Sequence, residues 1–354
     1  MHRAALHQDS ANRTRSVSQR SSSPLRVAII GAGLMGYWHG RTARYLNAQP
    51  VAIFDPDIKR ADVLARKLRV EVAKDLSDIF RQGIDAVHIC SPLSTHVALA
   101  GQTMEAGVHV LVEKPLAETA EDCGFLFDIA RRNSTILCPV HQMAFQDGIT
   151  AALASLADLG EITLIDMRIC SAGGAAGSDR TLDELICEIL PHPLSIMRKL
   201  WPHASWEPEH WLVSHPRAGE ILISGEYAGA LLSVLVSMHA RPTCFELVMY
   251  GHNGTIVLDF FHGFAVRYHG RVSRLHKIAR PLFSAIKVFG TASVNLLSRG
   301  LRGEAAYPGL RNLVQAFYTA VRGEAPIPIP REDVVAVAVA RDIISQRTAD
   351  AYRH

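Results

Sequence analysis

The sequence lacks the features that define several large classes of protein. Its 354 residues contain no uninterrupted apolar run close to the roughly 20 residues that a membrane-spanning helix requires. The net charge is only +3, so the charge balance does not point to a nucleic-acid partner. The six cysteines are scattered and include no CxxC pair, which argues against a disulfide framework and against a zinc site. We therefore expect reduced cysteines, no metal and a cytoplasmic protein.

The first 24 residues lack the apolar segment of a secretory signal. They are rich in Ser and Arg and contain a single acid, Asp9, a composition that slightly resembles an organelle transit peptide. We favour a disordered N-terminal extension over residues 1–24. The whole chain is 48% hydrophobic and 20% charged, which is ordinary for a globular protein, and it is long enough for two domains.

A glycine-rich loop follows the first apolar run of the chain. Residues 27–30 read VAII and lead directly into Gly31-x-Gly33-x-x-Gly36. This strand–turn–helix pattern is typical of a dinucleotide-binding fold: Gly31 permits the tight turn, Gly33 lets a pyrophosphate approach the backbone, and Gly36 lets the helix pack closely on the strand. The free N–H groups at the start of that helix would then face the phosphates.

A second apolar run, residues 51–54, ends in Asp55. The spacing from the glycine loop is that of the acidic residue that meets the adenosine ribose hydroxyls. A carboxylate there repels a 2′-phosphate, so the sequence favours NAD. The nearby Lys59 and Arg60 keep NADP open as an alternative.

The order of the predicted elements divides the chain into two parts. From residue 25 to about 142, strands at 26–30, 51–54, 70–73, 86–90, 109–112 and 135–139 alternate with helices. This alternation predicts an N-terminal Rossmann domain with a doubly wound parallel sheet over residues 25–145. Strands then follow one another from 161–169 to 263–268, interrupted by one helix at about 181–200, which predicts a C-terminal α+β domain with a large, mostly antiparallel open sheet over residues 146–354. The chain ends in helical segments at 309–323 and 331–347.

Residues 260–303 contain eight Lys or Arg and no Asp or Glu. Apolar residues recur at helical spacing in the middle of this segment, from Leu275 to Phe289. One interpretation is a basic amphipathic surface that meets a membrane, an anionic substrate or a partner subunit. The other is a helical insertion, at about residues 270–303, whose apolar face packs on its own domain, and we favour this second interpretation.

Glu113-Lys114-Pro115 follows the predicted strand at 109–112. Side chains at the carboxyl ends of parallel strands line the ligand crevice of such a sheet. A lysine there can hold a hydroxyl or carbonyl group, and partial desolvation lets it exchange a proton near neutrality. An ordinary surface lysine is the alternative.

Glu188 and His192 lie four residues apart in a predicted helix. On one helix face the carboxylate can orient the imidazole or raise its basicity. Pro191 and Pro193 flank the histidine and make the helix geometry imperfect. A polar helix face is the alternative interpretation. The loop at 90–96, CSPLSTH, lies at the same sheet edge as Lys114 and is expected to border the nicotinamide.

Together these segments resemble the Gfo/Idh/MocA oxidoreductase family, which includes glucose–fructose oxidoreductase and inositol dehydrogenase. The resemblance rests on GAGLMG at 31–36, FDPD at 54–57, CSPLSTH at 90–96, EKP at 113–115, the helix with His192, and AFYTAVRGEAPIPI at 316–329. It covers about residues 25–350.

The resemblance implies an N-terminal Rossmann domain that binds NAD or NADP and a C-terminal domain that forms the substrate pocket and often a subunit interface. Lys114 would act in proton transfer or substrate binding, His192 as acid or base, and Glu188 as the supporting acid. The cofactor contacts expected on this basis are Gly31, Gly33, Leu34, Met35, Gly36, Asp55, Ser91, Pro92, His96 and Glu113.

Two positions depart from the family pattern. The common D-x-x-x-H is E-x-x-x-H here, and the arginine often found after the sixth strand is replaced by Ala144. The resemblance implies hydride transfer between a nicotinamide and a secondary alcohol or ketone of a sugar, sugar derivative or cyclitol, by a homodimer or homotetramer. The alternatives are an NAD-dependent glycoside hydrolase that acts by transient oxidation, and a non-catalytic regulator that binds a sugar or the cofactor.

Overall fold

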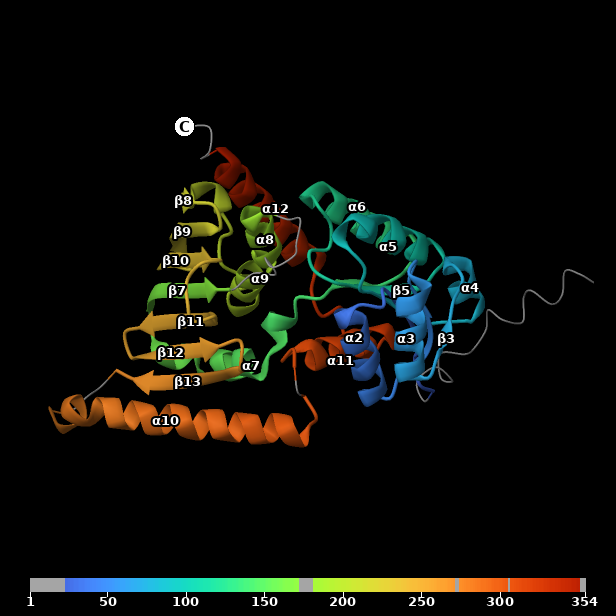
Figure 1. The fold of residues 1–354 in the computed structure, drawn as a ribbon. Coiled ribbons are helices and arrows are strands. Elements are labelled where there is room, and N and C mark those ends of the chain that lie inside the picture. Colours follow the sequence, from blue (N-terminus) through green and yellow to red (C-terminus); the bar gives the residue numbers. More distant parts are fainter. Residues whose placement is uncertain (1–22, 172–180, 271–273, 305, 351–354) are drawn as a thin grey trace, which may run out of the picture.

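The structure, a computed structural model, describes residues 23–171, 181–270, 274–304 and 306–350. Figure 1 shows two sheets side by side, and each sheet has its own hydrophobic core. Almost all of the predicted N-terminal extension, residues 1–24, lies outside the described residues.

The first sheet has six parallel strands in the order β3-β2-β1-β4-β5-β6. Its strands are β1 (Arg26–Ile30), β2 (Gln49–Phe54), β3 (Glu71–Val72), β4 (Ala86–Ile89), β5 (His109–Val112) and β6 (Leu137–Pro139). The intervening helices are α2 (Leu34–Tyr45), α3 (Ile58–Leu68), α4 (Leu76–Arg81), α5 (His96–Glu105) and α6 (Ala120–Arg132). The predicted doubly wound parallel sheet is therefore confirmed. The strand order reverses between β1 and β4, and a ligand crevice forms at such a switch point.

The second sheet has seven strands in the order β13-β12-β11-β7-β10-β9-β8. They are β7 (Ile162–Cys170), β8 (Leu212–Arg217), β9 (Glu220–Tyr227), β10 (Ala230–Ser237), β11 (Cys244–Gly251), β12 (Gly254–Asp259) and β13 (Phe264–His269). Only the central pair of β7 and β10 is parallel, so the predicted, mostly antiparallel sheet is also confirmed.

Helices cover one face of the second sheet, and its other face is open. The covering helices include α7 (Asp147–Ser155), α8 (Leu182–Ile189) and α9 (Pro191–Leu200). The register of β8 to β11 places four exposed side chains on the opposite face: Leu212, Leu222, Leu231 and Tyr250. An apolar face of this kind commonly marks a site of association.

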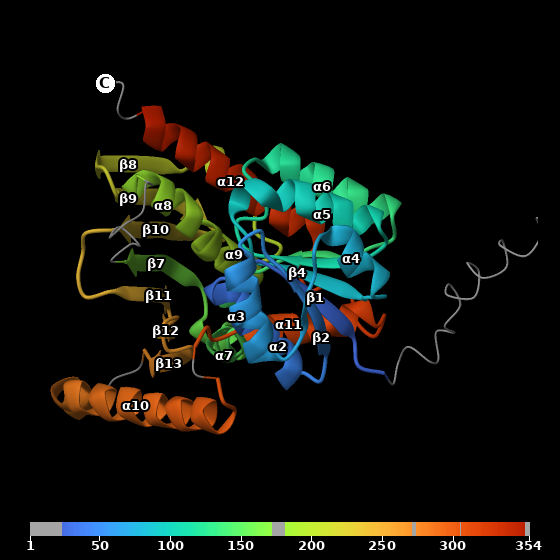
Figure 2. The same cartoon turned by 45° about the vertical axis from the view of Figure 1, so that its right-hand side comes forward.

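Two C-terminal helices return to the first half of the molecule. Helix α11 (Leu310–Val321) buries Leu313 and Phe317 in the core of the first sheet, and Figure 2 shows it beside α2. Helix α12 (Arg331–Asp350) packs on α6 of the first half and on α9 of the second. The division at residue 145 stays a prediction, but these helices join the two halves closely.

Helix α10 (Arg274–Leu301) contradicts the favoured prediction for residues 270–303. Its apolar face does not pack on its own domain, because Ile278 is 81% and Phe289 is 75% exposed. Its polar residues make the contacts instead: Asn295 and Arg299 both donate to the main-chain oxygen of His262. The amphipathic helix exists, but its orientation is the reverse of the expected one.

Candidate functional site

The glycine loop between β1 and α2 forms an open cradle. A Cβ at Gly36 would lie 2.0 Å from the main-chain oxygen of Gly31, and Gly31 itself has a φ of +98°. The lack of a Cβ at these two glycines therefore lets the turn and the start of α2 pack tightly together. Gly33, at the start of α2, has no heavy atom within 4 Å of the position a Cβ would take. Leu34 is exposed there, and Met35 is half-buried. The open N-terminus of α2 fits a pyrophosphate.

Asp55 stands at the end of β2 beside this cradle. One of its carboxylate oxygens accepts the N–H of Ala32 at 2.7 Å, and the other accepts the N–H of Asp57 at 2.8 Å. Asp57 in turn caps α3 by accepting the N–H of Lys59 at 3.0 Å. The Asp55 carboxylate is therefore fixed next to the loop, where it fits ribose hydroxyls and opposes a 2′-phosphate.

The loop after β4 is tied to the loop after β5 by His96. This buried imidazole lies 2.9 Å from the main-chain oxygen of Ser91 through Nε2 and 2.9 Å from that of Pro115 through Nδ1. The Ser91 hydroxyl contacts the Thr95 hydroxyl at 2.7 Å, and Pro92 is exposed. The ring of His96 thus faces backbone oxygens, while Ser91 and Pro92 lie at the sheet edge.

Lys114 follows β5 and reaches across to the second half of the molecule. Its Nζ donates a hydrogen bond to the main-chain oxygen of Glu188, at 3.1 Å. The side chain of Lys114 is only partly exposed. Two of the three predicted catalytic residues are therefore in direct contact, through the Lys114 side chain and the Glu188 main-chain oxygen.

The predicted helix at 181–200 is two helices. Helix α8 ends at Ile189, and α9 begins at Pro191. Pro191 and Pro193 have no N–H, so they cannot donate to the carbonyls four residues earlier. Glu188 and His192 therefore lie on either side of a helix junction.

The positive charge of Lys114 acts on two histidines, His192 and His141. Burial, followed by the charge of Lys114, holds the pKa of His192 well below its usual value. The same two causes lower the pKa of His141 to about 4. The Nδ1 atom of His192 is buried and has no hydrogen-bond partner among the described residues. Both imidazoles are thus neutral near pH 7.

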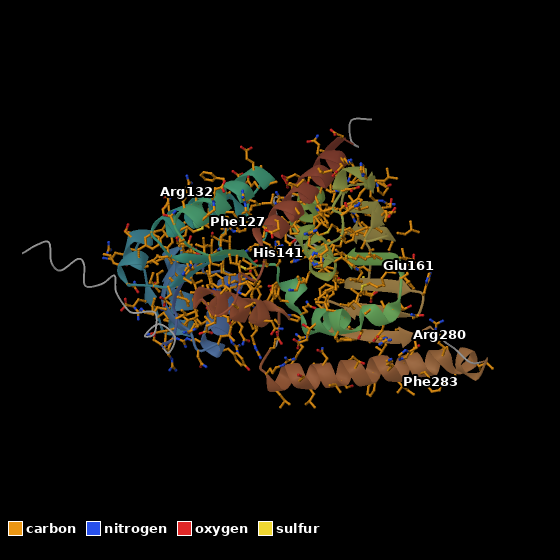
Figure 3. The ribbon with its side chains drawn as sticks, turned by 180° about the vertical axis from the view of Figure 1, so that it is seen from behind. Phe127, Arg132, His141, Glu161, Arg280 and Phe283 are labelled. Carbon is orange, nitrogen blue, oxygen red and sulfur yellow. The ribbon has the colours of Figure 1, made fainter. Side chains whose placement is uncertain are left out.

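His141 was missed in the sequence. It follows β6, and the carboxyl ends of all six parallel strands meet at one edge of the sheet. That topology is the signal that could have found it. Figure 3 shows His141 where the two halves of the molecule meet.

Glu113 is held by a buried chain of hydrogen bonds that the sequence also did not reveal. Its Oε1 lies 3.1 Å from Nε2 of His39, whose Nδ1 lies 3.0 Å from Nδ1 of His88, and Nε2 of His88 lies 3.0 Å from the hydroxyl of Tyr318. Burial lowers the pKa of His88 well below its usual value, which keeps that ring neutral. With a carboxylate at Glu113, one direction satisfies every atom: Tyr318 donates to His88, His88 to His39, and His39 to Glu113.

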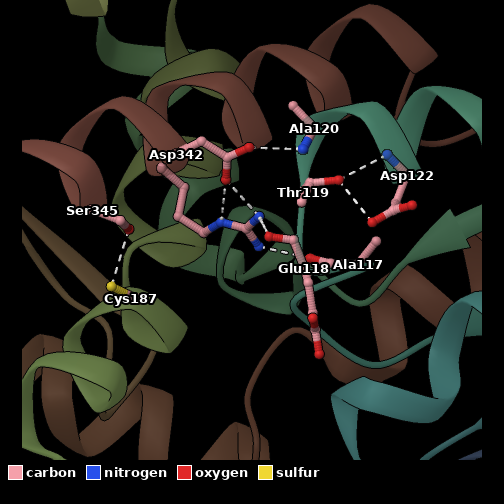
Figure 4. A network of polar contacts seen from close by, with 9 residues as sticks. Ala117, Glu118, Thr119, Ala120, Asp122, Cys187, Asp342 and Ser345 are labelled. Carbon is pink, nitrogen blue, oxygen red and sulfur yellow. Dashed lines mark hydrogen bonds and ion pairs between the residues drawn. The ribbon is translucent and has the colours of Figure 1, made fainter.

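Arg341 of α12 holds the backbone that follows Lys114. Its guanidinium donates to the main-chain oxygens of Ala117 and Glu118 at 2.8 and 2.6 Å, and it pairs with Asp342 at 2.7 Å. Asp342 also accepts the N–H of Ala120 at 2.8 Å, so both partners bind the same segment (Figure 4). Because Arg341 is almost fully buried, these charge-assisted hydrogen bonds contribute more to stability than exposed ones would.

Two cavities border this region. The larger, about 700 Å³, is bordered by the loops after β4 and β5 and by α8 and α12, and its walls include Pro92, Pro115 and Glu188. The smaller, about 270 Å³, is lined by His141 and Ala144 together with two cations of α9, Arg198 and Lys199. Ala144 stands where the family often has an arginine, and these two cations line the same cavity.

The match to known proteins is clearest in the first half. Residues 25–141 match the sequence profile of the Gfo/Idh/MocA family, described as an oxidoreductase family with an NAD-binding Rossmann fold. The N-terminal domain belongs to this family. The resemblance expected from the sequence motifs is therefore confirmed, and so is NAD as the cofactor of the fold.

Characterised relatives in this family match part of the chain. Over 117 residues the chain is 32% identical to the UDP-N-acetylglucosamine 3-dehydrogenase of Acidithiobacillus ferrooxidans, a match that covers 33% of this chain and 37% of the relative. Over 182 residues it is 31% identical to an inositol 2-dehydrogenase of Klebsiella pneumoniae, covering 50% and 54%. The chain thus spans about half, or less, of the length of these curated relatives.

Solved structures of the family extend the likeness to the whole fold. A crystal form of UDP-N-acetylglucosamine 3-dehydrogenase GnnA from Acidithiobacillus ferrooxidans superposes with a TM-score of 0.72 over 93% of this chain and 99% of that one, at 18% identity. An inositol dehydrogenase homolog from Azotobacter vinelandii, complexed with NAD⁺, gives 0.71 over 93% and 96%, at 20% identity. At these identities the likeness concerns the fold.

Proposed function

We propose that this protein is an NAD-dependent dehydrogenase that acts on a secondary alcohol, or the corresponding ketone, of a sugar, sugar derivative or cyclitol. The observation that carries the proposal is the convergence of Lys114 and His192 at the carboxyl edge of the parallel sheet, beside the open glycine cradle. The names of the curated relatives support the substrate class, because they act on inositol and on sugar derivatives.

His192 and Lys114 have different roles at the substrate hydroxyl. In the oxidation direction the neutral His192 accepts the hydroxyl proton as the general base. Lys114, oriented by the Glu188 carbonyl, holds the negative charge that develops on the substrate oxygen. The lowered pKa of His192 fits this role, because an imidazolium could not take the proton.

The cofactor is held by the first sheet. The N-terminus of α2 at Gly33 would bind the pyrophosphate, Asp55 the adenosine ribose, and the edge formed by Ser91, Pro92 and Glu113 the nicotinamide end. When bound, NAD supplies the hydride acceptor. His96 serves in this arrangement as a positioning residue, since its ring connects the loops that carry Ser91 and Pro115.

The direct test is NADH formation by the purified full chain with a panel of sugars, nucleotide sugars and inositols. We expect turnover on at least one member, and a loss in kcat of about 100-fold or more in Lys114→Met and in His192→Gln. Binding of NAD, followed by fluorescence titration, should persist in both variants. In His192→Gln the pH dependence of the remaining rate should also flatten.

Matched variants away from the site show whether a loss of turnover comes from the catalytic residues or from substituting a residue of the same type anywhere in the protein. Lys74→Met and His203→Gln remove a lysine and a histidine from exposed positions, and both should turn over like the wild type. Wild-type protein that binds NAD but turns over no member of the panel would contradict the proposal, as would Lys114→Met with wild-type rates.

We further propose that the protein forms a homo-oligomer through the open face of the second sheet and works in the cytoplasm. The exposed Leu212, Leu222, Leu231 and Tyr250 on one sheet face support the first point. The free cysteines support the second. No helix in the described residues has the length and apolarity that crossing a membrane requires. Light scattering with Leu231→Asp tests the oligomer, which that variant should weaken.

A further inference from the structure

Helix α10 presents its apolar side to solvent from residue 278 to residue 301. Ten large apolar side chains between residues 278 and 301 are exposed: Ile278, Leu282, Phe283, Ile286, Val288, Phe289, Val294, Leu296, Leu297 and Leu301. At 3.6 residues per turn, nearly all of them fall on one half of the helix. From residue 278 to residue 301 the helix rises by about 35 Å, so this is a long exposed apolar stripe. Apolar patches of that size on soluble proteins mark sites of association.

The opposite side of α10 is held to the protein by polar contacts. Asn295 and Arg299 donate to the His262 main-chain oxygen at 2.7 and 2.9 Å, and Arg302, just after the helix, pairs with Asp147 of α7 at 2.8 Å. These contacts fix which side of the helix faces outward. Both Figure 1 and Figure 2 place α10 at the margin of the molecule, alongside β13, with nothing beyond it.

The charges carried by α10 itself have one sign. Lys287 is exposed and donates to the main-chain oxygen of Arg267, which does not neutralise it, and Arg280, which Figure 3 labels near the N-terminal end of the helix, is also exposed. No Asp or Glu occurs anywhere in residues 260–303. A helix with an apolar outer side and exposed cations beside it has the pattern of a helix that lies in the surface of an anionic bilayer.

A second copy of the chain complements this surface poorly. Two copies meeting through α10 would bring two basic flanks together, and the segment contains no acid to pair with them. Anionic lipid headgroups supply the missing negative charge, and the acyl chains take the apolar stripe. We infer that α10 docks the protein on an anionic membrane surface, parallel to the bilayer, with Phe289 and its neighbours inserted below the headgroups. This inference is independent of the proposed function.

The test is flotation of the purified full chain with vesicles in a density gradient. We expect the protein to float with vesicles of phosphatidylcholine and phosphatidylglycerol and to float much less with phosphatidylcholine alone. Phe289→Asp should lower the partition coefficient between water and vesicles about tenfold or more, because an aromatic ring inserted in the bilayer is replaced by a charged carboxylate. Arg280→Glu should weaken binding to the anionic vesicles specifically.

The control is Phe125→Asp, which places the same change on an exposed phenylalanine of α6, where Phe125 is 51% exposed. It should float like the wild type, and Phe289→Asp should keep a melting temperature close to that of the wild type, because Phe289 is 75% exposed. Three results would overturn the inference: no flotation with anionic vesicles, wild-type flotation by Phe289→Asp, or a wild-type dimer without vesicles that Phe289→Asp converts to monomer.

Discussion

The buried histidine after β6 makes the protein sensitive to acid, and this sensitivity can be calculated. His141 is 4% exposed, and burial beside Lys114 lowers its pKa to about 4 from the usual 6.5. Between these two values the unfolded chain binds a proton that the native state does not bind. The free energy of unfolding therefore falls as the pH falls from about 6.5, and the loss levels off below about pH 4.

The size of this loss follows from the two pKa values. Their difference corresponds to about 3 kcal/mol when the pH has reached the folded-state value. Burial also lowers the pKa values of His88 and His192, so these residues add to the loss in the same direction. The total loss in the wild type is then greater than the part due to His141.

Urea unfolding of the wild type and of His141→Gln between pH 7 and pH 4 measures the loss of unfolding free energy that is due to His141. The variant cannot titrate, so its unfolding free energy should fall by about 3 kcal/mol less than that of the wild type. Lys114→Met serves as an internal check. Removing the nearby positive charge raises the pKa of His141, so the loss of unfolding free energy in this variant should lie between the losses in the wild type and in His141→Gln. Parallel pH curves for wild type and His141→Gln would refute the reasoning.

Two further substitutions test the supports of the site. Arg341→Met removes the charge-assisted contacts of an almost fully buried guanidinium with Ala117, Glu118 and Asp342, and it should lower the unfolding free energy by about 3 kcal/mol in urea titrations. Arg331→Met, at an exposed position of the same helix, should change it by less than about 0.5 kcal/mol. Tyr318→Phe leaves Nε2 of buried His88 without its donor and should cost about 1–3 kcal/mol, while Tyr45→Phe, at an exposed ring, should cost little. Equal effects within either pair would contradict the burial argument.

The elements of both sheets were predictable because their signals are local. Helix α3 occupies 58–68, between the predicted strands at 51–54 and 70–73, since Asp57 caps its start and its apolar residues recur at helical spacing. Strand β5 occupies 109–112 as predicted, because a short apolar run bounded by polar residues marks a buried strand. The glycine loop, Asp55 and Lys114 could likewise be placed at the carboxyl edge from the βαβ order alone.

The features that were missed depend on contacts between distant segments. His88 lies inside a strand and reads as an unremarkable polar residue until His39 and Tyr318 come to either side of it. The amphipathic pattern of α10 gives the direction of its apolar side relative to its polar side, but not which of them faces the protein. That choice depends on the His262 carbonyl and Asp147, which come from other elements.

The placement of Arg341 has a consequence for how the protein is made. The backbone after Lys114 is held by α12, and Glu113 is held through Tyr318 of α11, so both supports are translated about 200 residues after the sheet edge that they brace. Helix α11 also fills part of the core of the first sheet with Leu313 and Phe317. The Lys114 loop and the core beneath the parallel sheet are therefore both completed only when the last two helices have left the ribosome.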